Sequence, residues 1–464
     1  MVFSSLGFIF VFLPFVFVIY QLLSLVNHNF LKNIWLVISS LFFYYLGNER
    51  DLWWLLSSVI VNYIFAYCID YTEKRIIKKI FLGGSIALNL SVLVYFKFSG
   101  LFLENRNTII PLGISFFTFQ AISYTVDVYR DRRALRNPVD VALYITFFPQ
   151  LIAGPIIRFN EIEKEIQNRK TKISDLAAGI RRFIIGVCKK VLLANTLGEL
   201  ADMVFGYKEW GNCSILFLWL GLISYSLQIY YDFSGYSDMA IGLGRMFGFH
   251  FAENFNYPYI SKSLTDFWRR WHISLSRWFR DYLYIPIGGA RCGIVRHIFN
   301  LFVVWLATSL WHGVDLTFLF WGMSYFLFIV CEKYIFKPEN FKNKIYIILY
   351  RFFTMLMIIL LWMVFRSESI ISAGQMFLAL FGCAGNAFID KAFLFNLRSY
   401  LVPLISGIIF CVPIIPILEN WSGFSILSKE IYSLIESVVL LFLFVVSIAY
   451  IAIGSYNPFL YFIF

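Results

Sequence analysis

The sequence predicts an all-α polytopic membrane protein with about ten or eleven transmembrane helices and one or two re-entrant segments. Of its 464 residues, 60% are hydrophobic and 14% are charged, whereas soluble domains average about 45–50% apolar and about 25% charged residues. Apolar runs such as Ser4–Val26 reach the roughly 20 residues that a helix needs to cross a bilayer. The alternating polarity that is typical of outer-membrane barrel strands does not stand out.

The first four spans are predicted over Ser4–Val26, Leu31–Leu46, Leu52–Ile69 and Ile80–Phe102. No basic residue precedes Lys32, so the first run lacks the basic start of a signal peptide and is interpreted as a retained helix. The loop Asp70–Lys79 carries four basic residues, and an excess of Lys and Arg marks the cytoplasmic side. This places the N-terminus outside the cytoplasm and makes Glu104–Asn107 an outer turn.

Residues that break helices interrupt the apolar sequence after position 110. Pro111–Gln120 and Ser123–Arg130 contain Pro, Gly, Ser, Gln and Asp, which belong against protein or a water-filled cavity rather than lipid. Phe147–Arg158 is apolar but contains two prolines, so it is predicted to be re-entrant. Glu161–Ser174 is polar and basic, as expected of a cytosolic surface segment.

The remaining spans follow without a linker. They are predicted over Phe183–Phe205, Ile215–Tyr231, Thr317–Val330, Tyr346–Phe365, Val402–Leu418 and Val438–Gly454, with Ser369–Phe381 in the interface or partly spanning. Because no break in composition marks a second soluble domain, residues 1–464 are interpreted as one integral-membrane domain with a catalytic core at about 111–335.

Basic residues concentrate in two segments. Residues 130–190 contain 13 Lys/Arg against 6 Asp/Glu, and residues 258–300 contain 7 against 2. Both segments are therefore predicted to face the cytosol, mostly through orientation and contact with lipid headgroups, although a polyphosphate donor would also favour a basic mouth. The seven cysteines form no C-x-x-C pair, so neither a disulfide framework nor a metal site is expected. Nucleic acid is not an expected partner.

Polar side chains within predicted spans are candidates for function. Gln228, Asp232 and Asp238 are costly in hydrocarbon unless they face the bundle interior or water. Gln228 and Asp232 are therefore candidate substrate-binding residues. A hydrogen-bond network between helices explains the two aspartates equally well.

His312 is the strongest candidate for catalysis. It lies between Trp311 and Gly313 after an apolar run, which predicts a position deep in the membrane at a helix break. A neutral imidazole in a medium of low dielectric resists protonation and can accept a proton from a hydroxyl. A lone buried histidine is nevertheless more often structural.

His272 is the second candidate. If the helix continues through it, His272 shares a face with Trp268 four residues earlier. An amphipathic helix at the cytosolic interface explains the surrounding arginines and tryptophans without chemistry. The two histidines are thus expected at separate places, with His272 near the entrance for a donor. We expect His28 and His297 at a surface or interface, and His250 in packing or in a backbone hydrogen bond.

Three segments together resemble the membrane-bound O-acyltransferase family and, within it, the alginate O-acetylation branch. They are Tyr231–Ala240, Asp266–Trp278 with His272, and Ser309–Gly313 with His312. The segments Met1–Ser5, Pro111–Gln120, Phe148–Arg158 and Asn457–Phe459 are similar to that branch too, so the resemblance covers nearly the whole chain.

The resemblance implies a catalytic His312, with His272 as the second family histidine, inside a ring of helices around a central funnel. It implies transfer of an acyl group, typically acetyl, from a cytosolic thioester such as acetyl-CoA to an exported or cell-surface polysaccharide, with no permanently bound cofactor. Arg269, Arg270 and Arg277 are candidates for contact with the donor, and Trp311 for contact with substrate.

The expected partners are an extracytoplasmic protein of SGNH-hydrolase type, the polysaccharide synthesis machinery and membrane lipids, and the expected location is the plasma or inner membrane. Alginate, cellulose and peptidoglycan are all compatible acceptors. Two alternatives stay open: D-alanyl transfer to teichoic acid from a carrier protein, and a polysaccharide or lipid transporter.

Overall fold

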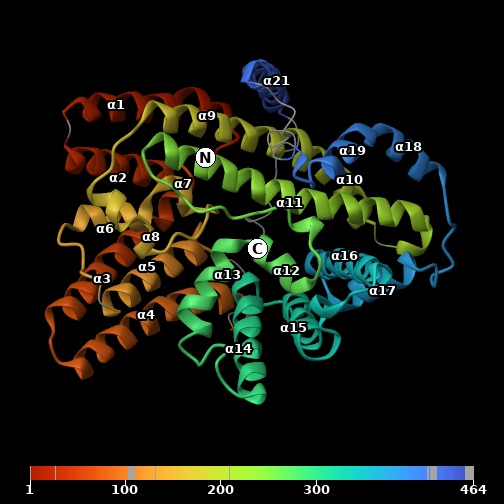
Figure 1. Cartoon of the computed structure of the whole chain (residues 1–464), viewed down its shortest axis with the longest axis horizontal. Coiled ribbons are helices and arrows are strands. Elements are labelled where there is room, and N and C mark those ends of the chain that lie inside the picture. The colour runs from red at the N-terminus through yellow and green to blue at the C-terminus, as the bar shows by residue number, and fades with distance from the viewer. Residues whose placement is uncertain are drawn as a thin grey trace. The chain divides into compact units, whose positions relative to one another are not determined.

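The computed structural model describes residues 2–26, 28–102, 110–130, 132–207, 209–414, 417 and 426–454 (Figure 1). These residues are helical with short connections, and no strand occurs among them, which confirms the all-α prediction. The predicted outer turn Glu104–Asn107 and the ending Asn457–Phe459 lie outside the described residues.

The chain forms two compact units, and each is described by itself. The first comprises Met1–Gly186, Tyr236–Glu253 and Arg277–Pro286. The second comprises Val187–Gly235, Asn254–Ser276 and Ile287–Phe464, and it contains both candidate histidines. That the whole chain acts as one enzymatic domain stays a prediction.

Within the described ranges, seven helices are long and apolar enough to cross a membrane, or eight if the bent pair Lys391–Ser399 and Leu401–Ile409 is one span. The seven are Phe8–Leu25, Glu49–Tyr71, Arg75–Phe98, Ile294–His312, Leu316–Asn340, Lys344–Arg366 and Glu430–Ala452. The polytopic class is confirmed, with fewer spans than the ten or eleven counted from the sequence. One reason is length, since the second predicted span is a helix of only 17 residues, Asn29–Tyr45.

The first unit is built mainly from nine helices of the described part and the C-terminal part of α11. Their bounds are α1 Leu13–Leu25, preceded by a π-helical turn at Phe8–Phe12, α2 Asn29–Tyr45, α3 Leu52–Tyr71, α4 Arg75–Phe102, α5 Ile114–Tyr129, α6 Pro138–Thr146, α7 Phe148–Leu151, α8 Phe159–Gln167 and α9 Ile173–Cys188. Helices α3, α4 and α5 pack together.

Helix α5 is covered by protein along nearly its whole length, which confirms that its polar residues avoid lipid. Its start depends on Gly113, whose φ of 72° is left-handed and whose added Cβ would lie 2.5 Å from the carbonyl oxygen of Leu151. The segment Phe147–Arg158 contains only the four-residue helix α7 and is buried. It is therefore broken as predicted, because its prolines prevent a longer helix.

The second unit holds the remaining helices (Figure 1). Their bounds are α10 Thr196–Phe205, α11 Ile215–Met246, α12 Leu264–Arg270, α13 Ile273–Phe279, α14 Ile294–His312, α15 Leu316–Cys331, α16 Lys344–Arg366, α17 Ile370–Leu380, α18 Lys391–Ser399, α19 Leu401–Ile409 and α21 Ile426–Ala452; α11 and α13 end in the first unit. Helix α14 packs against α15, and α15 against α16.

Helices α14 and α15 approach each other at Gly322. A Cβ at this position would lie 1.9 Å from the Ser309 hydroxyl oxygen and 3.4 Å from the carbonyl oxygen of Trp305. Small residues at such a crossing let two membrane helices come close. This contact lies one turn of helix before His312 and so helps to fix where α14 ends.

Candidate active site

His312 is the last residue of α14, so the predicted helix break is confirmed. The chain turns away at Gly313, which has extended dihedral angles, and α15 begins at Leu316. A Cβ at Gly313 would lie 2.3 Å from a ring carbon of Phe318, so only glycine fits here without a shift. The His312 side chain is buried by protein, not merely by its position in an apolar sequence.

The backbone of α14 fixes the His312 ring. Its Nδ1 lies 2.8 Å from the carbonyl oxygen of Thr308, four residues earlier. A carbonyl oxygen can only accept, so Nδ1 donates and carries the proton. In the neutral ring, Nε2 is then unprotonated and able to accept a proton.

His272 lies at a break between two short helices rather than within one helix. Helix α12 ends at Arg270 and α13 begins at Ile273, and His272 has a left-handed φ of 44°. The expectation of a continuous helix with Trp268 and His272 on one face is therefore wrong. The break has a tertiary cause, because the Ile273 amide donates to the carbonyl oxygen of Asn254 at 2.9 Å instead of continuing the helix. Left-handed backbone at a residue other than glycine costs about 1–3 kcal/mol and clusters at functional sites.

Both histidines contact Trp311. The Trp311 ring centroid is 6.0 Å from that of His272 and 4.8 Å from that of His312. Burial, and then the charge of His312, hold the pKa of His272 well below its ordinary value of 6.5. The structure thus brings together two histidines that the sequence had assigned to separate places, and it keeps His272 neutral at physiological pH.

An aromatic cluster encloses His312. It consists of Trp268, Trp271, Trp305, Trp321, Tyr325, Trp362 and Phe365, together with Trp311, whose ring contacts His312 directly. The His312 ring lies 4.9 Å from Trp321 and 5.5 Å from Phe365, and Trp321 in turn contacts Trp268 and Tyr325. Such a wall excludes water and strengthens any electrostatic interaction inside it.

Some polar atoms of this cluster are buried without a hydrogen-bond partner among the described residues. They include the Nε1 atoms of Trp268 and Trp321 and the hydroxyl of Tyr325. An unsatisfied buried donor is costly and calls for an explanation. In this position the donors would suit a reaction in which negative charge develops on an oxygen.

The predicted arginines differ in their freedom to bind a donor. Arg269 is exposed, and its side chain makes no ion pair or hydrogen bond within the described part of the chain. Arg270 is engaged, since it pairs with Asp266 at 3.0 Å and donates to the carbonyl oxygen of Asn256 at 3.3 Å. Arg277 is exposed but belongs to the first unit. Of the two predicted donor-binding arginines that lie in the second unit, Arg269 is the better candidate.

Gln228 and Asp232 take part in polar links between helices. The Lys190 ammonium lies 2.6 Å from Asp232, and both side chains are almost fully buried. The Gln228 amide oxygen accepts from Arg366 at 3.2 Å, and Arg366 also pairs with Asp202. The contact with Lys190 matches the structural alternative that the sequence left open for Asp232. A role in substrate binding stays a prediction for both Gln228 and Asp232.

Two other histidines match their predicted roles only in part. His297 is buried and hydrogen-bonds Tyr334, so it is not a surface residue. His250 is half exposed, so it does not serve packing, but its backbone N–H donates to the Glu165 carboxylate at 3.0 Å, as the other predicted role requires. Its ring contacts Glu165 at 2.8 Å and Asp175 at 3.3 Å. Burial alone would lower the pKa of His250, but hydrogen bonds to the two carboxylates outweigh it and raise that pKa.

The sequence matches the model of the family described as MBOAT, membrane-bound O-acyltransferase family, over residues 12–371. The chain belongs to this family. It is therefore an acyltransferase and a multi-pass membrane protein, and the resemblance inferred from its motifs is confirmed.

Curated relatives agree with this assignment. The chain is 39% identical over 400 residues to the probable alginate O-acetylase of Pseudomonas syringae pv. tomato, covering 82% of this chain and 75% of the relative. It is 36% identical over 426 residues to the peptidoglycan O-acetyltransferase of Helicobacter pylori, with coverages of 83% and 80%. The teichoic acid D-alanyltransferase of Bacillus subtilis is 30% identical over 250 residues, with coverages of 52% and 62%.

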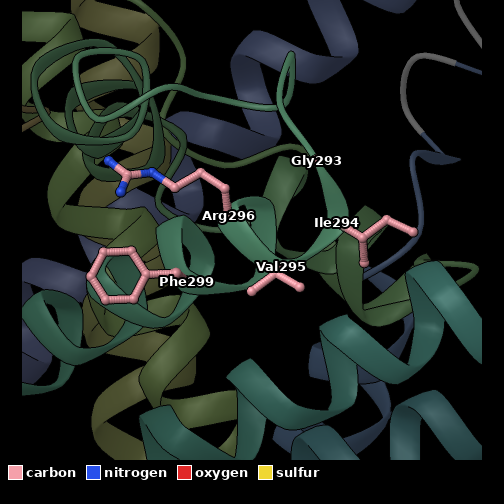
Figure 2. A pocket seen from close by; sticks show the side chains of 5 residues that line it. All are labelled: Gly293, Ile294, Val295, Arg296 and Phe299. Carbon is pink, nitrogen blue, oxygen red and sulfur yellow. The ribbon is translucent and has the colours of Figure 1, made fainter.

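A hollow of about 680 Å³ in this O-acyltransferase lies at the other end of α14 (Figure 2). Its lining includes Ile294, Val295 and Phe299, and Arg296 is tied to the carbonyl oxygen of Ile287 at 3.0 Å. Helix α14 has 19 residues, so the hollow is roughly 28 Å from His312 at 1.5 Å per residue. It is thus separate from the histidine pair.

Sequence reasoning missed several residues of the O-acyltransferase site. Thr308 could have been found, because a residue four positions before His312 in a helix offers its carbonyl to the ring. Trp321 and Tyr325 read as ordinary apolar residues of a span. Asn254 gave no signal, since it lies 18 residues before His272 and outside every quoted motif.

Proposed function

We propose that this O-acyltransferase transfers an acetyl group from a cytosolic thioester, with acetyl-CoA as the donor, to hydroxyl groups of an exported or cell-surface polysaccharide. The observation that carries the proposal is His312, a buried imidazole whose Nδ1 is fixed by Thr308 beside unsatisfied donors. Acetyl is favoured over D-alanyl because the relatives named for O-acetylation align with about four fifths of the chain, against 52% for the D-alanyltransferase.

His312 acts as the general base. Its Nε2 takes the proton of an acceptor hydroxyl while the hydroxyl oxygen attacks the thioester carbonyl carbon. The C–O bond forms, the C–S bond breaks, and the departing thiolate receives the proton back from the imidazolium. No oxidant or metal enters the balance. A relay through an acyl-histidine is the less favoured variant of the same chemistry.

The surroundings of His312 assist this step. The Nε1–H of Trp321 and the hydroxyl of Tyr325 offer donors to the carbonyl oxygen as negative charge develops on it. His272, held neutral, orients the acceptor or the thioester next to Trp311. Arg269 is exposed and suits a contact with the phosphates of the donor.

The enzyme resides in the plasma or inner membrane with its N-terminus outside the cytoplasm, so that the basic segments face the donor. An extracytoplasmic partner of SGNH-hydrolase type completes the modification of the glycan, alongside the polysaccharide synthesis machinery. Membrane lipids cover the apolar faces of the spanning helices.

The test replaces His312 with alanine and measures ester-linked acetate on the surface glycan. We expect acetylation to fall by about 10²–10⁴-fold, the range that a positioned base contributes. His297→Ala is the matched control, because His297 is also a buried histidine of α14 but hydrogen-bonds Tyr334 instead. Both variants are compared at equal abundance in the membrane.

Unchanged acetylation in His312→Ala would refute the catalytic assignment. D-alanine rather than acetate on the glycan of the wild type would shift the proposal to the D-alanyl branch. Loss of glycan export together with acetylation would point to transport instead.

A further inference from the structure

Asn254 is fully buried, and its hydrogen bonds fix the orientation of its side-chain amide. Its Oδ1 accepts from the backbone amide of Ser274 at 3.1 Å and from the Ser274 hydroxyl at 2.9 Å. A backbone N–H can only donate, so the atom at this place must be the amide oxygen rather than the nitrogen. The assignment needs no assumption about which way the amide points.

The same oxygen faces the second histidine. His272 Nδ1 lies 3.2 Å from Asn254 Oδ1. Because an amide oxygen accepts, Nδ1 carries the proton, and Nε2 is unprotonated in the neutral ring. His312 has the same tautomer through a different acceptor, the carbonyl oxygen of Thr308. Both rings beside Trp311 therefore have a basic Nε2.

Asn254 also supports the backbone at this turn. Its carbonyl oxygen accepts from the amide of Ile273 at 2.9 Å, directly after the left-handed His272. The neighbouring Phe233 ring packs edge-on against the imidazole at a centroid distance of 4.6 Å. Asn254 thus hydrogen-bonds both the His272 ring and the backbone at this strained position. The Phe233 ring of α11 limits rotation of the imidazole.

We propose that Asn254 is the positioning residue of the second histidine, holding His272 in the tautomer protonated on Nδ1 and in its left-handed turn. The inference rests on the proposed function, in which His272 assists acyl transfer. Asn254 does not itself touch the reacting atoms. An orienting partner of this kind sets both the geometry and the basicity of a functional histidine.

The charges around His272 allow a test by pH. On α14 the titratable neighbour is His312, which interacts with His272 electrostatically. On α12, Arg270 pairs with Asp266 and Arg269 is exposed; α13 carries the exposed Arg277. On α11, Asp232 pairs with Lys190. A carboxylate introduced at position 254 would be a new charge directly at Nδ1.

The experiment compares Asn254→Ala and Asn254→Asp in purified full-length protein, with acetyl-CoA as donor and a polysaccharide fragment as acceptor. We expect Asn254→Ala to lower kcat by about 10- to 100-fold, by analogy with the loss of a partner that orients a metal-ligating histidine. The KM for acetyl-CoA should change little. Asn254→Asp keeps the acceptor oxygen and should recover most of kcat at alkaline pH.

The pH profile separates positioning from mere stability. A carboxylate beside Nδ1 favours the imidazolium and so raises the pKa of His272. On acidification, the His272 ring of the Asn254→Asp variant therefore becomes protonated at a higher pH than that of the wild type. The acidic limb in the pH profile of kcat should move up by about one pH unit or more. Asn256→Ala, at an exposed position two residues away, is the matched control and should leave the profile unchanged.

An Asn254→Ala variant with the wild-type kcat would overturn the inference. So would an Asn254→Asp variant that loses as much kcat as Asn254→Ala and whose acidic limb is not shifted. Wild-type activity in His272→Ala would overturn it too. A wild type that transfers no acetyl group at all would instead refute the proposed function, so the two failures are distinguishable. Thermal midpoints in detergent are recorded for every variant, to compare kcat only among folded proteins.

Discussion

Lys190 and Asp232 form an ion pair that is almost closed to solvent, with 4% and 2% of their side chains exposed. Lys190 belongs to a π-helical turn, Lys189–Asn195, and Asp232 to α11, so the pair links two elements of the second unit. Removing both charges from water is expensive, and their attraction offsets that cost only while both are present. The loss of stability is therefore largest when only one of the two charges is removed.

Lys190→Met and Asp232→Leu are each expected to destabilise the protein by about 3–5 kcal/mol, because each leaves one buried charge without its partner. The double variant should recover most of this loss. The measurement is the thermal midpoint in detergent, together with the amount of protein in the membrane. A double variant whose loss equals the sum of the single losses would contradict the predicted coupling.

The pair also shows what the sequence can and cannot predict about single residues. Asp232 stood out because a carboxylate in an apolar run needs a reason. Its partner lies 42 residues earlier, and no local pattern connects the two positions. Asn254 is the stronger case, since its role depends on two contacts across 18 residues of chain. Residue types were predictable, but partners were set by tertiary structure.

Among the elements, the crossing of α14 and α15 fixes the position of His312. Ser309 donates its hydroxyl to the carbonyl oxygen of Trp305 at 2.8 Å, so it cannot turn away from Gly322 without losing that bond. Even after rotation, the Ser309 Cβ would remain 3.1 Å from a new Cβ at position 322. The two helices must therefore separate if any side chain is added there.

Gly322→Ala is expected to destabilise the protein by about 1–3 kcal/mol through overpacking and to lower acetyl transfer by moving the end of α14. Gly374→Ala is the matched control, since it is also a helical glycine but nothing lies within 4 Å of its added Cβ. Ser309→Ala should relieve part of the loss in a double variant. Equal behaviour of the two glycine variants in thermal unfolding and acetylation would contradict the prediction.

Helix ends were predictable only where the cause is local. The end of α14 was predicted because Gly313 interrupts an apolar run, and the broken segment around α7 because prolines cannot continue a helix. The break at His272 has no such mark, as neither Gly nor Pro occurs between Trp268 and Trp278. It arises because Asn254 takes the amide of Ile273. The aromatic cluster likewise required helices from distant parts of the sequence.

For the whole molecule, the proposed orientation can be tested at two short connections of the first unit. Glu49 precedes the N-terminus of α3 and Lys74 follows its C-terminus, and both residues are exposed. Cysteines placed at these two positions should therefore face opposite sides of the membrane. With the N-terminus outside the cytoplasm, Glu49→Cys should react with an impermeant maleimide in intact spheroplasts. Lys74→Cys should react only after permeabilisation.

The background for this experiment is Cys383→Ala, which removes a cysteine that is exposed in the structure. The reversed labelling pattern would place the N-terminus in the cytoplasm and the basic loop outside. Labelling of both sites in intact spheroplasts would mean that α3 does not cross the membrane, despite its 23-residue apolar span with Glu49–Asp51.

The aromatic cluster gives this enzyme an optical signal of its own. The cluster that surrounds His312 contains six of the thirteen tryptophans of the chain, namely Trp268, Trp271, Trp305, Trp311, Trp321 and Trp362. Each of these rings except that of Trp311 contacts another tryptophan ring, so excitation can pass between them, and Trp311 contacts both histidines. A substrate that enters the cluster, or a proton that arrives on either histidine, would alter the emission of nearly half the tryptophans at once. Intrinsic fluorescence can therefore follow occupancy of this site in the unlabelled protein.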